Sequence, residues 1–131
     1  MNDNVEIVRR FLRCIERGET GKVIEAFYAP GAIQEEFPNL LYPKGQKRTV
    51  AELSKSSESG KNLVAEQRYD VRNVVASGEQ VAVEIAWSCV MKVPLRSVPA
   101  GGSLRAVIAA FFTFEGGLIV SQRNYDCYDP F

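Results

Sequence analysis

The chain has 131 residues, of which 46% are hydrophobic, and its 16 basic residues balance 16 acidic ones. This length fits one domain spanning residues 1–131, with a core large enough to need neither disulfide bonds nor a structural metal. A chain without net charge, and without a basic run interleaved with aromatic residues, argues against a nucleic-acid partner. The sequence has no histidine, which excludes Ser-His and Cys-His nucleophiles and the histidine ligands of most catalytic zinc sites.

Cysteine spacing and hydropathy argue against a disulfide-bonded, a metal-binding or a membrane protein. Cys14, Cys89 and Cys127 are odd in number and show no C-x-x-C spacing, so we expect reduced thiols and no metal site. The first residues lead directly into a charged amphipathic segment, and no run of roughly eighteen apolar residues occurs. We therefore expect a cytoplasmic protein with no membrane partner.

The N-terminal part of the chain predicts three helices. An apolar stripe at helical spacing indicates a first helix over residues 3–17, ended by Gly18; the stripe consists of Val5, Val8, Leu12 and Ile15. A second helix is expected from Thr20 to Ala29, just before a Pro-Gly pair. The Thr49-Val50-Ala51-Glu52 run has the form of a capping box and predicts a third helix to about residue 60.

The rest of the chain has sequence patterns that predict β-strands. A short strand is expected at 32–37, followed by a loop to Arg48, and the β character becomes continuous from Leu63. Long strands are predicted at 63–76 and 80–93, then a hairpin over 103–131 that turns at Glu115-Gly116-Gly117. Helices segregated from antiparallel strands predict an α+β domain with one strongly curved sheet folded against the helices.

The order of these elements, together with several local motifs, resembles the nuclear transport factor 2-like superfamily and its SnoaL-like (polyketide cyclase-like) branch. The motifs are Phe11, Gly18-Glu19, Glu35-Glu36-Phe37-Pro38, Pro43-Lys44-Gly45, Phe112 to Ile119 and Arg123-Asn124-Tyr125. The resemblance implies a cone, with a mixed or antiparallel sheet packed on three N-terminal helices around an apolar pocket. It also implies a homodimer through the outer sheet face. Members include isomerases, hydrolases, cyclases and non-catalytic binders, so the site decides the function.

Two mechanisms known in the superfamily are disfavoured by the matching positions. Ketosteroid isomerases combine a tyrosine, a carboxylate base and an aspartic acid, which correspond here to Phe11, Glu36 and Ala110. Only the base is kept, and the loss of one oxyanion donor costs on the order of a hundred- to a thousand-fold in rate. Limonene epoxide hydrolases use an arginine and two aspartates, and the matching Ile85, Trp87 and Asn124 include no acid or base.

Polyketide cyclases need only one carboxylate in an apolar pocket, because the conjugation of the substrate carries the enolate charge. Glu36 and Asp126 are the candidate catalytic residues, with Glu36 the better candidate base, since burial beside apolar walls raises a carboxyl pKa into the useful range. The simpler structural alternatives are a solvated Glu35-Glu36 pair and an Asp126 that pairs with Arg123. Chemistry of this kind requires no cofactor.

Strand alternation predicts the pocket wall. Val83, Ile85, Trp87 and Cys89 are expected to face inward, and Gln122, Asn124, Asp126 and Tyr128 share one face of the last strand unless a bulge exchanges the faces. The predicted ligand pocket contains Phe11, Tyr69, Ile85, Trp87, Ala110, Phe112 and Asn124. We expect a small hydrophobic or aromatic ligand, either transformed by a cofactor-free isomerase, cyclase or lyase acting on a carbonyl compound, or only bound by a non-catalytic or dimerisation module.

Overall fold

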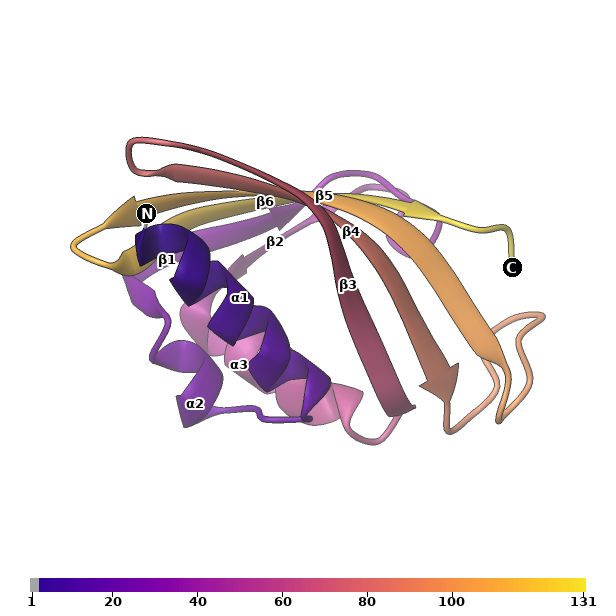
Figure 1. Ribbon diagram of the computed structural model, residues 1–131. Helices are drawn as coiled ribbons and strands as arrows, with labels where there is room; N and C mark the ends of the chain where they lie inside the picture. Colours follow the sequence, from indigo (N-terminus) through magenta and orange to yellow (C-terminus); the bar gives the residue numbers. More distant parts are fainter. Residues whose placement is uncertain (1–2) are drawn as a thin grey trace.

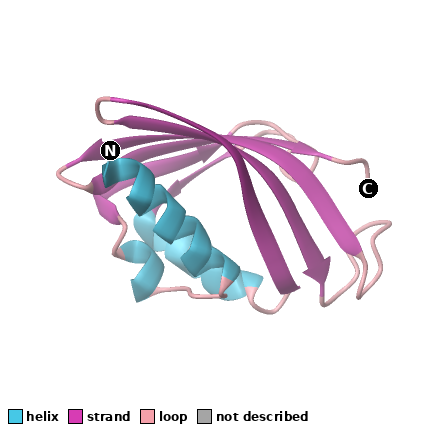
Figure 2. Cartoon of the chain, in the orientation of Figure 1, coloured by secondary structure: helices cyan, strands magenta, loops and turns pink. Residues whose placement is uncertain are grey.

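The computed structural model describes residues 3–131, in which three helices lie against the concave side of one strongly curved sheet (Figure 1, Figure 2). The helices are α1 (Asp3–Glu16), α2 (Lys22–Glu25) and α3 (Val50–Gly60). The strands are β1 (Tyr28–Glu36), β2 (Gln46–Thr49), β3 (Val64–Ser77), β4 (Gln80–Met91), β5 (Ser103–Glu115) and β6 (Leu118–Tyr128). The prediction of a cone-like α+β fold is confirmed.

The six strands form a single mixed sheet in the order β2-β1-β6-β5-β4-β3. β1 pairs with β6 in parallel, and every other neighbouring pair is antiparallel. Register shifts interrupt the pairing in β1, in β3 and in the β5–β6 hairpin. Such irregularities increase local twist and bending, and they allow the long strands to curl around the helices.

Helix α1 closes the concave side of the sheet as its apolar stripe predicts. Val8, Phe11 and Leu12 are 1%, 3% and 5% exposed, and Phe11 makes edge contacts with three aromatic rings of the core. The helix ends one residue before its expected end, and Gly18 follows with φ +78°, a left-handed conformation that glycine adopts without strain.

The predicted second helix is wrong over most of its length. Only Lys22–Glu25 is helical, and β1 begins at Tyr28 and runs through the Pro-Gly pair at 30–31. The reason is tertiary: Tyr28 is buried and pairs with Ile119 of β6, whose amide donates to the Phe27 carbonyl at 2.9 Å. Pro30 lies where the register shifts between Tyr28 and Ile33, so its missing N–H costs no ladder bond.

The loop expected before the third helix contains a strand. β2 pairs residues 46–49 with residues 33–36 of β1, and it escapes apolar pattern analysis because all four of its residues are polar. The capping box that follows is confirmed. Thr49 Oγ1 accepts from the Glu52 amide at 3.2 Å, and Glu52 Oε1 accepts from the Thr49 amide at 2.9 Å.

The long strands agree with the sequence prediction to within about two residues at each end, a normal margin for element boundaries. The β5–β6 hairpin turns on Gly116 and Gly117, whose φ angles of +56° and +80° are those of a type I′ turn. No helix among residues 3–131 is long and apolar enough to cross a membrane.

Candidate functional site

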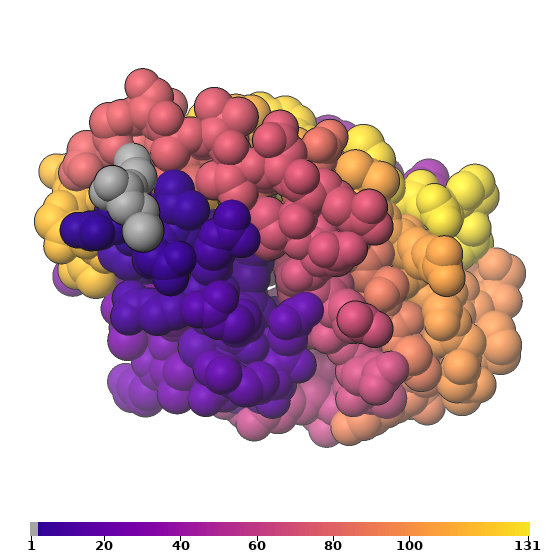
Figure 3. Space-filling view, in the orientation of Figure 1, coloured from indigo at the N-terminus to yellow at the C-terminus, as the bar shows by residue number. Residues whose placement is uncertain are grey.

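A cavity of about 560 Å³ lies between the helices and the concave face of the sheet. Its walls come from α1, α3 and the four longest strands, with contributions from β1 and the loops after α1 and α3. A space-filling view shows a small opening between the surfaces of α1 and β3 (Figure 3). This volume is in the usual range for a site that encloses a small organic molecule.

All the residues predicted for the site line this cavity. They are the two carboxylates and the seven predicted pocket residues, namely Glu36, Asp126, Phe11, Tyr69, Ile85, Trp87, Ala110, Phe112 and Asn124. The alternation of β6 also holds, because Gln122 and Tyr128 line the same wall. The structure therefore brings the candidates together, and the roles assigned to them remain predictions.

The strand register arranges the polar lining in neighbouring rows across the sheet. Glu36 lies opposite Asn124, Asn124 opposite Ala110, and Ala110 opposite Val83. The next row joins Asp126, Ile108, Ile85 and Val71, and the row after it joins Tyr128, Ala106, Trp87 and Tyr69. Since residues two apart on a strand share a face, Asp126 lies between the row of Glu36 and Asn124 and the aromatic row.

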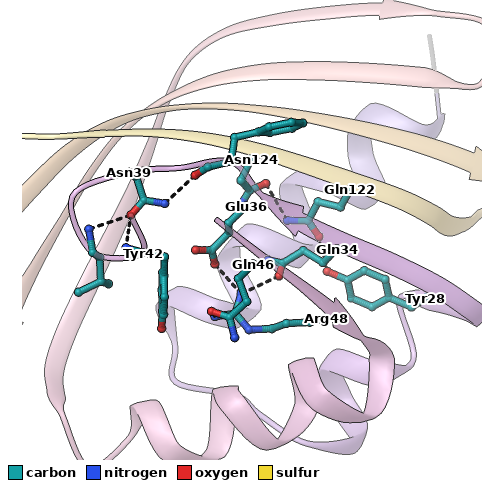
Figure 4. A network of polar contacts seen from close by, with 11 residues as sticks. Tyr28, Gln34, Glu36, Asn39, Tyr42, Gln46, Arg48, Gln122 and Asn124 are labelled. Atoms are coloured by element: carbon teal, nitrogen blue, oxygen red, sulfur yellow. Dashed lines mark hydrogen bonds and ion pairs between the residues drawn. The ribbon is translucent and has the colours of Figure 1, made fainter. Parts of the chain in front are cut away.

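Glu36 is held by Arg48, which the sequence analysis did not select. Arg48 Nη1 lies 2.6 Å from Glu36 Oε1 and 2.9 Å from Gln34 Oε1, and Nη2 donates to Gln46 Oε1 at 3.1 Å (Figure 4). The side chains of Arg48 and Glu36 are 6% and 12% exposed. The second oxygen of Glu36, Oε2, is buried without a hydrogen-bond partner. The solvated Glu35-Glu36 pair is thereby excluded for Glu36.

Asp126 is the other carboxylate with an unsatisfied oxygen. Its Oδ1 atom is buried and accepts no hydrogen bond. Burial, reinforced by the nearby charge of Glu36 and opposed by that of Arg48, raises the pKa of Asp126 to about 6. The alternative pairing with Arg123 does not occur, because that guanidinium lies over the Phe111 ring, 5.5 Å from its centroid.

An amide chain fixes the wall beside Glu36. The Tyr28 hydroxyl donates to Gln122 Oε1, and Gln122 Nε2 donates to Asn124 Oδ1 at 3.2 Å. Burial raises the pKa of Tyr28, so its hydroxyl keeps its proton. Buried polar groups that satisfy one another in this way hold fixed orientations. Only parity could have indicated Gln122 from the sequence, whereas nothing in the pattern distinguished Gln34 or Tyr28.

The aromatic row lies further along the same sheet, on the other side of Asp126 from Glu36. The Trp87 indole N–H donates to Gln67 Oε1 at 3.1 Å, which supplies the partner that a buried indole requires. The Tyr128 ring makes edge contacts with Trp87 and Phe131, at centroid distances of 6.0 and 5.8 Å. Burial raises the pKa of both Tyr69 and Tyr128, and the charge of Asp126 raises them further. Both phenols therefore stay protonated and available as donors.

The family model for the SnoaL-like domain matches residues 8–122. The chain belongs to the SnoaL-like domain family. None of the curated proteins compared with this SnoaL-like domain matches it in sequence. No group of three or more His, Cys, Asp or Glu side chains within residues 3–131 of the domain could hold a metal ion.

Several solved structures share the fold of this SnoaL-like domain. IdmH of Streptomyces antibioticus, a proposed polyketide cyclase, has a TM-score of 0.77 at 14% identity, covering 95% of this chain and 92% of its own. A proposed SnoaL-like polyketide cyclase from Jannaschia sp. CCS1 has a TM-score of 0.74 at 19% identity, covering 94% and 84%. AclR of Streptomyces galilaeus, a proposed hydroxylase, has a TM-score of 0.76 at 14% identity, covering 95% and 74%. These likenesses show the fold alone.

The geometry permits acid-base chemistry on a mostly apolar molecule. The SnoaL-like domain offers two buried carboxylates, an arginine committed to one of them, and neutral phenol and amide donors around the other. A carboxyl whose pKa lies near neutrality exchanges protons efficiently with a bound molecule.

Proposed function

We propose that this SnoaL-like domain binds a small, mainly apolar carbonyl compound and moves a proton on it without a cofactor, as an isomerase, cyclase or lyase. One observation carries the proposal: Glu36 and Asp126 line the same cavity, and each keeps a buried oxygen without a partner. Leaving such an oxygen unsatisfied costs about 1–3 kcal/mol, and more for a charged group. A ligand that supplies a proton or a donor would remove that cost.

Asp126 is the proposed base. With a pKa of about 6, it is largely ionised at pH 7 and still basic enough to accept a proton from a carbon next to a carbonyl group. Glu36 takes a different part, because Arg48 already neutralises it at 2.6 Å. Two carboxyl groups whose environments differ in this way are typical of an acid-base site.

The charges and walls of the cavity favour a neutral ligand. Two carboxylates face the cavity or its edge, and Arg48, the cation beside them, is paired with Glu36. An anionic ligand would meet an excess of negative charge in a site where water screens poorly. The apolar wall, which includes Phe11, Ile85 and Phe112, favours a ring system. The proposed cyclases among the structural neighbours agree with this class of ligand.

The proposal excludes the two other mechanisms of the superfamily for the reasons found in the sequence. Phe11 and Ala110 line the cavity without a donor group, so the oxyanion site of the ketosteroid isomerases is not rebuilt at those positions. Ile85 and Trp87 replace the charged pair of the epoxide hydrolases. Trp87 already donates to Gln67, and it carries no group that could act as a base.

Deuterium exchange into a ketone tests the proposal. We expect the wild-type protein to accelerate exchange at the α-carbon of 2-tetralone in D₂O, followed by proton NMR. Asp126→Asn should remove most of the acceleration, since a positioned base contributes on the order of 10²- to 10⁴-fold. Glu36→Gln should reduce the rate less. The matched control Asp70→Asn alters a carboxylate that is 62% exposed and paired with Arg72, and its rate should equal that of the wild type.

A non-catalytic binder of the same ligands is the alternative. It would bind 2-tetralone through the apolar wall and show no exchange above the buffer rate. Full activity of Asp126→Asn would likewise remove Asp126 from the mechanism.

Association of two copies is part of the same proposal. The convex face of the sheet exposes apolar and aromatic side chains, including Val107 (54% exposed), Phe111 (37%) and Tyr125 (41%). Tyr125 stacks on Phe37 at a centroid distance of 4.5 Å, with their planes 9° apart. A contiguous apolar surface of this kind favours a protein interface, which supports the homodimer expected from the sequence resemblance.

A further inference from the structure

Tyr69 occupies a position that the proposed function leaves unused. It lines the cavity from β3 and stands at one end of the row that continues through Trp87 and Ala106 to Tyr128 on β6. Across the small side chain of Ala106, the Trp87 and Tyr128 rings make an edge contact with centroids 6.0 Å apart. Tyr69 and Tyr128, the two ends of the row, both line the cavity.

The hydroxyl group of Tyr69 is available as a hydrogen-bond donor. Burial and the nearby charge of Asp126 raise the pKa of Tyr69, so its hydroxyl keeps its proton and can donate it. None of the side-chain hydrogen bonds among residues 3–131 has the Tyr69 hydroxyl as donor. Because Tyr69 lines the cavity, an oxygen atom of a bound ligand is the acceptor that this hydroxyl would meet.

Asp126 faces the same space. The charge of Asp126 is the strongest electrostatic influence on Tyr69 after burial itself, yet Asp126 Oδ1 has no hydrogen-bond partner. Both side chains line the same cavity. The Tyr69 hydroxyl can donate a hydrogen bond and Asp126 Oδ1 can accept a proton. Together they suit a ligand that carries both a carbonyl oxygen and an acidic C–H group.

We propose that the Tyr69 hydroxyl binds the carbonyl oxygen of the substrate while Asp126 faces the adjacent carbon, so that the site accepts simple cyclic ketones. This inference rests on the proposed function. In the ketosteroid isomerases, the hydrogen-bond donors to the substrate oxygen stand at the positions of Phe11 and Ala110. In this domain the Tyr69 hydroxyl, on β3, would take their place. A substrate no longer needs a second conjugated carbonyl group to carry the enolate charge.

The step balances without an oxidant or reductant. The Asp126 carboxylate takes the α-proton, the C–H electron pair forms the new C=C bond, and the carbonyl π electrons move to oxygen. The resulting enolate oxygen accepts a hydrogen bond from Tyr69, which keeps its own proton. Asp126 then returns its proton to the same carbon or to another carbon of the conjugated system, giving exchange or isomerisation.

Tyr69→Phe tests the inference in the 2-tetralone exchange assay. We expect a loss of about 100-fold, the usual effect of removing one oxyanion donor. The matched control is Tyr125→Phe, on the convex face and 41% exposed, which should exchange at the wild-type rate. Tyr128→Phe, at the other end of the row, should lose less than Tyr69→Phe. Wild-type exchange by Tyr69→Phe, with Asp126→Asn inactive, would overturn the inference and leave the proposed function standing.

If no exchange occurs, a binding measurement tests the role of Tyr69 separately from the proposed catalysis. 2-Naphthol and naphthalene share one ring system and differ by a single oxygen, and both can be titrated by fluorescence. Tyr69→Phe should weaken 2-naphthol binding at least about tenfold and leave naphthalene binding unchanged, because a site built to bond an oxygen responds to its partner. That result without exchange would sink the proposed catalysis and keep Tyr69 as the oxygen-binding group.

Equal affinity of the wild type and Tyr69→Phe for 2-naphthol would overturn the inference, as would failure of the wild type to bind it. Circular dichroism checks that each variant is folded. If Tyr69→Phe does not fold, Tyr69→Leu gives a second test, since it also removes the hydroxyl donor from the cavity wall. We expect it to weaken 2-naphthol binding and to leave naphthalene binding within about threefold, and unchanged 2-naphthol affinity would contradict the proposal.

Discussion

Asp126 occupies an environment that opposes its charge. Burial raises its pKa from 3.8 to about 6, so the folded protein binds this proton more tightly than the unfolded chain does. The sign follows directly: the folded state has its full stability below about pH 4 and loses part of it as pH rises through 6. A protein retains a destabilising group of this kind where function requires it.

Asp126→Asn should therefore stabilise the fold at alkaline pH. Each pKa unit corresponds to about 1.4 kcal/mol, so we expect the free energy of unfolding at pH 8 to rise by about 1–3 kcal/mol. At pH 4 most of the gain should disappear, because Asp126 is then protonated in the folded protein. Urea denaturation at the two pH values measures the difference. A variant less stable than the wild type at pH 8 would contradict the assigned environment.

Arg48 should be far more sensitive to substitution than an exposed arginine. Its Nη1 serves Glu36 and Gln34, and both ion-pair side chains are nearly buried. Arg48→Met would leave Glu36 as an uncompensated buried charge, at a cost of about 3–5 kcal/mol. The exposed Arg72, 3.0 Å from Asp70, provides the matched control Arg72→Met, with an expected loss below about 1 kcal/mol.

Adding Glu36→Gln to Arg48→Met should recover much of the loss, because the second substitution removes the stranded charge. Chemical denaturation of the single and double variants measures this coupling. Additive losses would show that the pair does not interact in the folded protein.

At the scale of elements, the β2–α3 junction determines where Arg48 is placed. β2 ends at Thr49, and the same residue caps α3 through the reciprocal bonds with Glu52. The helix has no buried residue, so its N-terminus depends on this cap more than on packing. The cap thus fixes the chain one residue after the arginine that holds Glu36.

Thr49→Ala should lower the free energy of unfolding by about 1 kcal/mol, the typical value for loss of an N-cap side chain. Ser59→Ala, near the end of the same helix, removes only a bond to the Lys55 carbonyl and should change stability by less than about 0.5 kcal/mol. Thermal denaturation compares the two. Equal effects would show that the capping box contributes nothing specific.

The elements that could be predicted from the sequence are those that carry a periodic apolar pattern or a defined terminal signal. Helix α1, the capping box and the four long strands have such signals, and the alternation of β6 placed Asn124 and Asp126 on the cavity wall. The strand β2 has none, because its one buried side chain is the charged Arg48.

The prediction of a longer second helix was wrong for a related reason. Pairing of Tyr28 with Ile119, about ninety residues away in the chain, overrides the local preference for a helix. The ion pair of Arg48 and Glu36 likewise depends on a strand register that local pattern does not encode. The prediction of Glu36 as the better base changes with this pairing, and Asp126 becomes the stronger candidate.

At the scale of the whole molecule, the helices cover the concave face of the curved sheet, which borders the cavity, and leave the convex face uncovered (Figure 1). A sheet face that is open to solvent is normally polar, and an apolar face is normally covered by another surface. The concave face has the helices and the cavity, and we propose a second copy for the convex face.

Val107→Lys should shift the protein from dimer to monomer, because Val107 is 54% exposed on the convex face and a lysine there would bury its charge in the interface. Val23→Lys, on α2 and 45% exposed, should leave the assembly unchanged. Sedimentation velocity gives the oligomeric state of each variant. A monomeric wild type at micromolar concentration would remove the dimer from the proposal.

The most direct test of the account is the pH dependence of 2-tetralone exchange. If Asp126 is the base, the wild-type rate should be near its maximum above pH 7, fall to half at about pH 6, and decrease tenfold per unit below pH 5. Asp126→Asn should show no such transition at any pH. A wild-type rate that does not change between pH 5 and 8, or an Asp126→Asn variant that keeps the transition, would contradict the central claim.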